Sequence, residues 1–335
     1  MKIRYQLTCL LLLVSFTTIA QTDKQATIKK MTDSIKLATL SELAVKNPAL
    51  RQINISTDII SRGNISSKLY NDPLFKGKAS TVRTNLLFNV PVKSWGKNSL
   101  SASVSYFQQH IQIREVQSFS PMLNNNDFVS DKSTVGLSFG IQRRDSIFGR
   151  PVFLMASVLG VTNDASSIKK LSYLGTAIFP LKQTATTRYS VGIILNIDPS
   201  LKVPVVPLFT YWHKFSNDIE LNFNLPQQAG LRKAFSDRLS GTLGTSLSGS
   251  IAFFNLTQPN LPHDANYTTI DLKTGPGIEY RLGKKFMVGV NGGILTPLSA
   301  RAFDRDKTSS EYFISNKLSN VLYMNFTFSV LPFLK

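Results

Sequence analysis

The segment Leu322-Tyr323-Met324-Asn325-Phe326-Thr327-Phe328-Ser329-Val330 alternates between two kinds of side chain. Every even position is large and apolar, and the odd positions from Asn325 to Ser329 are small or polar. Successive side chains of a β-strand point to opposite faces of the sheet, so this period of two predicts a strand with one apolar face and one polar face.

The same alternation recurs along the chain after residue 51. Clear examples are the segments 82–90, 135–141 and 219–225, in which mostly Val, Leu, Ile and Phe occupy one face. The other faces carry Asn, Glu, Arg, Ser and Gly, a composition that suits a wet interior. We therefore expect an all-β fold, a transmembrane antiparallel β-barrel with an apolar outside. A soluble exported β-sandwich also alternates, and alternation alone does not exclude it.

The lengths of the predicted links alternate as well. Membrane barrels have short periplasmic turns and longer outer loops. The short links are 93–98, 145–150, 182–187, 213–217 and 282–284, and the longer polar links are 61–79, 114–131, 162–169, 254–266 and 297–319. With the short links in the periplasm, the chain forms about 12–14 strands. The count is 14 only if the chain crosses once between Pro226 and Phe235; otherwise 51–60 leaves the barrel as well.

Two further expectations concern the rims and the closure of the barrel. Trp95 lies in a short predicted turn and Tyr211-Trp212 borders another, which is typical of aromatic girdles at membrane interfaces. The last strand, 322–330, is expected to close the barrel against Arg51–Ile60 or against Val82–Val90.

The first 20 residues have the features of a secretory signal peptide. Lys2 and Arg4 precede an apolar run over 7–16, and a small-residue ending leads to Gln21. The run is shorter than the roughly 20 residues of a spanning helix. We expect cleavage after residue 20, an N-terminal periplasmic segment over 21–50, and the barrel over 51–335. The segment 21–50 is expected to be a short helix or a poorly ordered leader; a partner-binding or lumen-plugging helix is the alternative.

Composition narrows the chemistry. Cys9 is the only cysteine and lies in the signal segment, so the mature chain has no disulfide and no thiolate site. Of 38 basic residues two precede residue 21, which leaves 36 against 20 acidic residues. The basic residues fall largely in and beside predicted turns and do not form a nucleic-acid surface. Lipopolysaccharide and anionic lipids of the outer membrane are the expected partners, with no nucleic acid.

The segment 270–282 carries the most suggestive charges. Asp271, Lys273, Glu279 and Arg281 share one parity and hence one inner wall of a barrel. We expect this charge ladder to form opposite-charge pairs between residues two positions apart. One hypothesis is a charged constriction that selects solutes, and the other is a structural ladder that fills and stiffens the interior.

A catalytic site is the weaker hypothesis. His263-Asp264, with Ser246 or Ser248 on the preceding strand, has the residue types of a barrel hydrolase or acyltransferase acting on envelope lipids. A loop histidine beside an aspartate is more often simply solvated. The three histidines of the chain have no metal-ligand spacing, so we expect no metal and no cofactor.

Several phrases resemble an uncharacterised family of predicted outer-membrane β-barrels from Bacteroidota, a domain of unknown function. The resemblance covers about residues 47–335 and rests on the phrases Asn47–Arg51, Tyr106–His110, Asp198–Pro207 with Tyr211–Phe215, and Leu261–Thr269. It implies an outer-membrane location and folding by the barrel-assembly machinery, and it transfers no functional residues. The chain departs from the usual assembly signal, a terminal aromatic residue, because Leu334-Lys335 follow Phe333.

The sequence thus favours a non-enzymatic outer-membrane barrel that passes or binds a small solute, or that has a structural surface role. A barrel of this size is narrower than the 16–18-stranded porins, so a gated or plugged lumen is expected over an open general pore. A barrel enzyme and a soluble exported β-sandwich binding protein remain the alternatives.

Overall fold

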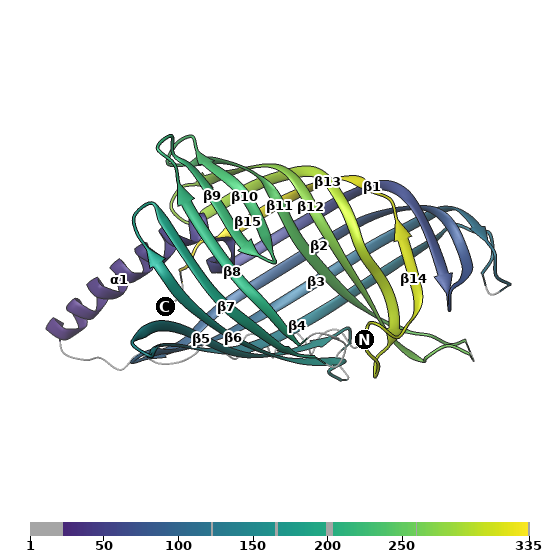
Figure 1. The fold of residues 1–335 in the computed structure, drawn as a ribbon, viewed down its shortest axis with the longest axis horizontal. Helices are drawn as coiled ribbons and strands as arrows, with labels where there is room; N and C mark the ends of the chain where they lie inside the picture. The colour runs from purple at the N-terminus through teal and green to yellow at the C-terminus, as the bar shows by residue number, and fades with distance from the viewer. Residues whose placement is uncertain (1–22, 122, 165–166, 199–203, 259, 334–335) are drawn as a thin grey trace, which may run out of the picture.

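The computed structural model describes residues 23–121, 123–164, 167–198, 204–258 and 260–333, so the predicted signal peptide lies outside the described residues. The described chain contains the helix α1, Asp23–Lys46, the short 3₁₀ helix η1, Pro48–Leu50, and one antiparallel sheet (Figure 1). Its strands are β1 Ile53–Leu69, β2 Asp72–Trp95, β3 Asn98–Ser118, β4 Phe128–Ile147, β5 Arg150–Thr162, β6 Lys170–Gln183, β7 Thr187–Ile197, β8 Val205–Lys214, β9 Ile219–Leu225, β10 Gln228–Ala234, β11 Leu239–Asn255, β12 Asp264–Leu282, β13 Phe286–Asp304, β14 Tyr312–Leu318 and β15 Val321–Val330.

The sheet closes into a barrel with 14 strand positions. Each strand pairs with its neighbours in sequence, and β14 and β15 share one position because both pair with β13 on one side and β1 on the other. The closing ladder runs from Ile53 opposite Val330 to Ile60 opposite Tyr323. This confirms the antiparallel barrel, the higher strand count, and closure against the first strand. The uncertain crossing between Pro226 and Phe235 is β10.

The two ends of the barrel differ. We call the end where β1 begins and β15 ends the proximal end, and the other the distal end. Strand heights are uneven: β2 has 24 residues, whereas β9 and β10 have seven each and lie in the proximal half (Figure 1). A tilted strand needs roughly 9–11 residues to cross a bilayer. The barrel wall is therefore tall on the side of β2 and low on the side of β9 and β10.

Two predicted long links are wrong. The stretch 61–79 is not a loop, because β1 and β2 continue through it to a tight turn at Tyr70 and Asn71, which have φ of 47° and 76°. The stretch 297–319 shrinks to the link 305–311 between β13 and β14. Both stretches look polar in sequence because, near the distal end, the polar side chains of these strands point outward.

An apolar belt covers the outer face of the barrel. The outward side chains of β4 at Val135, Leu137, Phe139 and Ile141 are 42–49% exposed, and Leu322 on β15 is 66% exposed. Other exposed belt residues are Val104, Ile193, Leu195, Ile270, Ile278, Val290, Ile294, Met324, Phe326 and Phe328. A contiguous apolar surface of this extent is rare on soluble monomers and typical of a lipid-facing one.

Beyond the belt, toward the distal end, the two faces of the tall strands exchange character. The outward residues of β3 change from Val104 and Tyr106 to Gln108, His110 and Gln112. The inward residues change in the opposite sense, from serines at 101, 103 and 105 to the apolar side chains of residues 111, 113 and 116. The distal part of the barrel thus has the polarity of a soluble protein, with an apolar interior.

The distal part is also pinched. Strands β4 and β11 lie seven positions apart in the ring, yet they contact each other. Near this contact the Nζ atom of Lys132 on β4 lies 4.3 Å from the ring centroid of Phe254 on β11. The pinch separates a lobe made of β1–β4 and β11–β15 from the side of the barrel that carries the short strands.

Candidate functional site

The centre of the lumen holds a layer of charged side chains. Lys273 on β12 donates to Asp58 on β1 with an Nζ–Oδ2 distance of 2.6 Å, and Arg83 on β2 forms an ion pair with Asp271 on β12. The side chains of Asp58 and Asp271 are about 5% exposed or less. In the ring β12 and β1 are separated by β13 and the β14–β15 position, so these contacts bridge non-adjacent strands.

Amides complete this layer, which we call the central layer: Asp58, Arg83, Asp271, Lys273 and Asn325. The Nδ2 atom of Asn325 donates to the second oxygen of Asp58 at 2.8 Å. Asn325 in turn accepts from Asn291 on β13 at 3.3 Å. Both Asp58 oxygens therefore have hydrogen-bond partners, which offsets the cost of burying this side chain.

The predicted charge ladder lies on one inner wall, but its partners differ from those expected. Asp271, Glu279 and Arg281 are each less exposed than the residues that flank them on β12, and Lys273 is less exposed than Thr274. None of the ion pairs of the described residues joins Asp271 to Lys273 or Glu279 to Arg281; each residue binds a group from elsewhere. Residues two apart on a strand point in parallel, so long inward side chains reach other strands more easily than each other.

The C-terminal end of α1 covers the proximal mouth. The rest of the helix projects away from the barrel (Figure 1). Ala44 is fully buried against Met287 and Leu331. Glu42 accepts from Arg281 at 2.9 Å. The helix thus ends against the inner side of the barrel rim, and it is held there by apolar contact and by charge.

Arg51 joins the helix to the barrel. Its side chain is 2% exposed; Nε donates to the carbonyl of Ala44 at 3.2 Å, and an Nη lies 2.7 Å from a carboxylate oxygen of Glu279. The last carbonyls of a helix carry partial negative charge, so a guanidinium there is favourable. The 3₁₀ turn η1 brings Arg51 back to the helix end, where the other Nη also donates to Ser329.

A second contact crosses the mouth. Lys46, the last residue of α1, lies 2.8 Å from Glu220 on β9, and Trp212 on β8 donates its indole N–H to the same carboxylate at 3.0 Å. Strand β9 lies on the opposite side of the ring from β1. Trp212 therefore points into the lumen, and the expectation that it belongs to an outward aromatic girdle is wrong. Trp95, at the end of β2, is 43% exposed.

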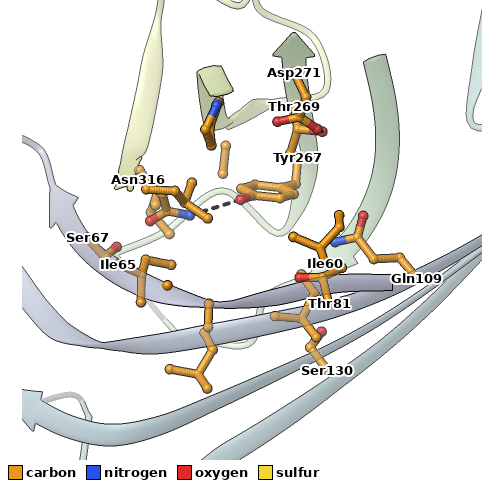
Figure 2. Close-up of a pocket in the computed structure, with 18 of the residues that line it drawn as sticks. Ile60, Ile65, Ser67, Thr81, Gln109, Ser130, Tyr267, Thr269, Asp271 and Asn316 are labelled. Carbon is orange, nitrogen blue, oxygen red and sulfur yellow. Dashed lines mark hydrogen bonds between the residues drawn. The ribbon is translucent and has the colours of Figure 1, made fainter. Parts of the chain in front are cut away.

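A cavity of about 220 Å³ occupies the distal lobe above the central layer (Figure 2). Its walls are largely apolar and come from both halves of the lobe. Arg83, Asp271 and Gln109 lie at its boundary with the central layer. Apolar residues on its wall include Ile65, Phe75, Ile113, Phe128, Phe254 and Phe313. The sequence does not reveal this cavity, because its lining comes from strands throughout the chain. The signal that could have indicated it is the pair of apolar residues 111 and 113 on the inward face of the predicted strand.

The structure does not assemble the hypothetical catalytic group. His263 Nδ1 lies 2.9 Å from the carbonyl oxygen of Leu256, and Asp264 binds Arg305 at 2.7 Å. Asp264 is opposite Asn255 on β11, seven residues from Ser248, a separation of about 23 Å along a strand. Ser246 lies two residues farther. No described group of three His, Cys, Asp or Glu side chains is arranged to hold a metal ion.

Neither helix of the described residues is both long enough and apolar enough to cross a membrane.

Comparison with known proteins gives a family but no activity. Residues 48–331 match the family model described as "Domain of unknown function (DUF6268)". No curated protein matches the chain.

Among solved structures, the chain resembles several barrels at low identity. An outer membrane channel from Pseudomonas putida F1 is 9% identical, with 84% of this chain and 96% of that chain covered and a TM-score of 0.35. The transport unit of the autotransporter AIDA-I from Escherichia coli is 12% identical, with 88% and 97% covered and a TM-score of 0.35. The toluene transporter TodX from Pseudomonas putida is 10% identical, with 83% and 88% covered and a TM-score of 0.32. Likenesses this distant carry nothing about solutes or mechanism to this chain.

Proposed function

We propose that this chain, which belongs to the family described as "Domain of unknown function (DUF6268)", is an outer-membrane β-barrel that passes a small solute through a lumen closed by charged side chains. The family brings no activity with it. The proposal is therefore supported by the exterior, the central layer and the covered mouth of this barrel.

The exterior supports the location. The apolar belt suits the hydrocarbon core, and the polar outer faces of the tall strands suit a region beyond it. Outward basic side chains lie beyond the belt at Arg62, Lys68, Lys76 and Arg114. The anionic groups of lipopolysaccharide are the counter-charge that we propose for these residues. The distal end then faces outward and α1 lies in the periplasm. Export through a cleaved signal and folding by the barrel-assembly machinery are part of the same proposal.

The central layer is the observation that carries the passage function. A ladder that only stiffens the wall would join neighbouring strands, whereas these ion pairs extend through the lumen between strands three or four positions apart that do not touch. Long cationic side chains can move aside and make new contacts with water or solute, because the ends of Lys and Arg are flexible. The layer would then act as a constriction that opens without any change of the barrel wall.

The α1 contacts add a second closure at the periplasmic mouth. Lys46 and Glu42 bind two different strands at that mouth, β9 and β12, and both contacts are electrostatic and partly exposed. Such contacts are weak individually and weaken further with salt. We therefore infer a barrel that is closed at rest and not an open general pore.

Single-channel recording in planar bilayers tests the proposal. The double variant Arg83→Ser/Lys273→Ser replaces the two cationic side chains of the central layer by short neutral ones and leaves the carboxylates of Asp58 and Asp271. We expect a larger conductance than for the wild type and a preference for cations. The matched control is Lys76→Ser/Lys78→Ser, which removes the same charge from the outer face of β2 and should conduct like the wild type.

Unchanged, flat traces for the lumen variant over a wide voltage range, in protein that shows the heat-modifiable gel shift of a folded barrel, would overturn passage through the lumen. That result would favour the alternative hypothesis, in which the charged side chains only fill and stiffen the interior. Release of the protein as a soluble periplasmic species, without detergent, would overturn the outer-membrane location.

A further inference from the structure

The distal cavity borders the central layer and has features of a binding site. Its volume of about 220 Å³ exceeds the roughly 150 Å³ of a dry apolar cavity that binds benzene. Most of its wall is apolar: Ile65, Phe75 and Ile113 are each at most 7% exposed and form one buried cluster. A compact apolar body of about ten non-hydrogen atoms fits this space.

Polar side chains also line the cavity, and two of them form a pair on its wall. Ser67 on β1 and Asn316 on β14 lie directly opposite each other in the β1–β14 ladder, and both line the cavity (Figure 2). Directly opposite residues have Cβ atoms about 4.5–5.5 Å apart, so one small group can reach both side chains.

The polar atoms of this pair are not satisfied. Ser67 is 1% exposed, and neither its Oγ atom nor the Oδ1 atom of Asn316 has a hydrogen-bond partner among the described residues. The other end of the Asn316 amide has a partner, because its Nδ2 atom donates to the hydroxyl of Tyr267 at 3.1 Å. Leaving a buried polar atom without a partner costs about 1–3 kcal/mol, so such a pair inside an apolar cavity points to a ligand group that completes it.

The available atoms define that group. Asn316 Oδ1 can only accept a hydrogen bond, and Ser67 Oγ can donate or accept one. A hydroxyl group, which donates one hydrogen bond and accepts others, satisfies both atoms at once. An anionic group does not, because its oxygens would face the lone pairs of Asn316 Oδ1. The nearby cation Arg83 is already engaged by Asp271.

We propose that the distal cavity binds a small neutral alcohol or phenol, with the hydroxyl group on Ser67 and Asn316 and the apolar body among the residues of the lobe. This deepens the proposed function, since a ligand held above the central layer is a solute awaiting passage. The binding itself depends only on the cavity.

Isothermal titration calorimetry on the full-length protein in detergent tests this with three probes of similar shape: 4-ethylphenol, 4-ethyltoluene and 4-ethylbenzoate at pH 7. We expect the wild type to prefer the phenol over the other two by about tenfold, the value of one buried hydrogen bond. In Ser67→Ala/Asn316→Leu the preference for the phenol over the toluene should disappear. Ser66→Ala, on the outward face of the same strand, is the matched control and should behave like the wild type.

A cavity-filling variant, Ala302→Leu, locates the site, because Ala302 lines the cavity and is 6% exposed. It should weaken all binding in excess of micelle partitioning, while the heat-modifiable gel shift reports that the barrel is folded. Equal affinity of the wild type for phenol and toluene, tighter binding of the benzoate, or full phenol binding by a folded Ala302→Leu variant would each overturn the proposal. If phenol binds as expected and the lumen variants do not conduct, the cavity is a binding site and the passage function is wrong.

Discussion

Lys273 and Asp58 are joined by an ion pair of 2.6 Å although β13 and the β14–β15 position separate their strands. The two residues are 215 positions apart in the chain. Their contact crosses a chord of the barrel, and the neighbouring ion pair of Arg83 and Asp271 lies at the boundary of the distal cavity.

This ion pair should contribute to stability as a coupled unit. In Asp58→Asn the ammonium of Lys273 loses its charged partner inside the lumen, and we expect a loss of about 1–3 kcal/mol in the free energy of unfolding. Adding Lys273→Met should recover part of this loss, because no unpaired charge remains. Urea unfolding of the two single variants and the double variant in lipid vesicles measures the coupling.

An exposed ion pair serves as the reference for that cycle. Lys78 and Glu115 lie 2.7 Å apart on the outer face, where both side chains are more than 40% exposed. Water screens this pair, so its coupling should be much the smaller. Equal coupling in the two cycles would show that the central layer is as hydrated as the surface.

The belt predicts where a charge prevents insertion. Met324 on β15 is 47% exposed and belongs to the belt, so Met324→Lys should cost about 2–4 kcal/mol in folding into bilayers. Ser66→Lys, on the outward face of β1 beyond the belt, should fold like the wild type. The heat-modifiable gel shift after insertion into vesicles separates the two, and equal folding yields would contradict the position given to the belt.

The exchange of faces on β3 makes an opposite pair of predictions at adjacent positions. Ile113→Ala removes a side chain that is 6% exposed inside the distal lobe, and should destabilise the barrel by about 2–4 kcal/mol. Gln112→Ala, on the outer face, should change stability by less than about 0.5 kcal/mol. Were the distal interior wet like a channel, the two variants would have similar and small effects.

Arg51 should control the attachment of α1. Arg51→Met removes the contacts with the helix carbonyls and with Glu279, so the end of the helix should leave the mouth more often. Hydrogen exchange over residues 37–46 should become faster, with the strands unchanged. Arg62→Met, a cation on the outer face, is the control, and unchanged exchange in Arg51→Met would mean that apolar contact of Ala44 alone holds the helix.

Much of the barrel could be predicted because a period of two survives in any half-buried strand. The alternation in β4, β9 and the last strand, β15, predicts the correct faces, and one of the two closing partners that it leaves open, 51–60, is the observed one. The same rule wrongly predicts a loop over 61–79, the distal parts of β1 and β2, because their outward residues, such as Lys68 and Lys76, are polar where a membrane strand should be apolar.

The site could be predicted only in part. That Asp271, Lys273, Glu279 and Arg281 share a wall follows from parity alone. Their partners do not, because Asp58, Arg83 and Arg51 are brought opposite them by closure of the ring and by the return of the chain after α1. The cavity required in addition the pinch between β4 and β11, which no local pattern encodes.

The exchange of faces along the tall strands has a consequence for how the protein is made. In β3 the outward side chains of Val104 and Tyr106 gain their burial free energy only when lipid surrounds them, whereas the inward side chains at 111, 113 and 116 gain theirs in water. The distal lobe can therefore collapse on itself in an aqueous compartment before the rest has a bilayer to enter. A chaperone that delivers this chain unfolded must shield apolar side chains on both faces of the same strand: those that will face lipid and those that will face the interior of the distal lobe.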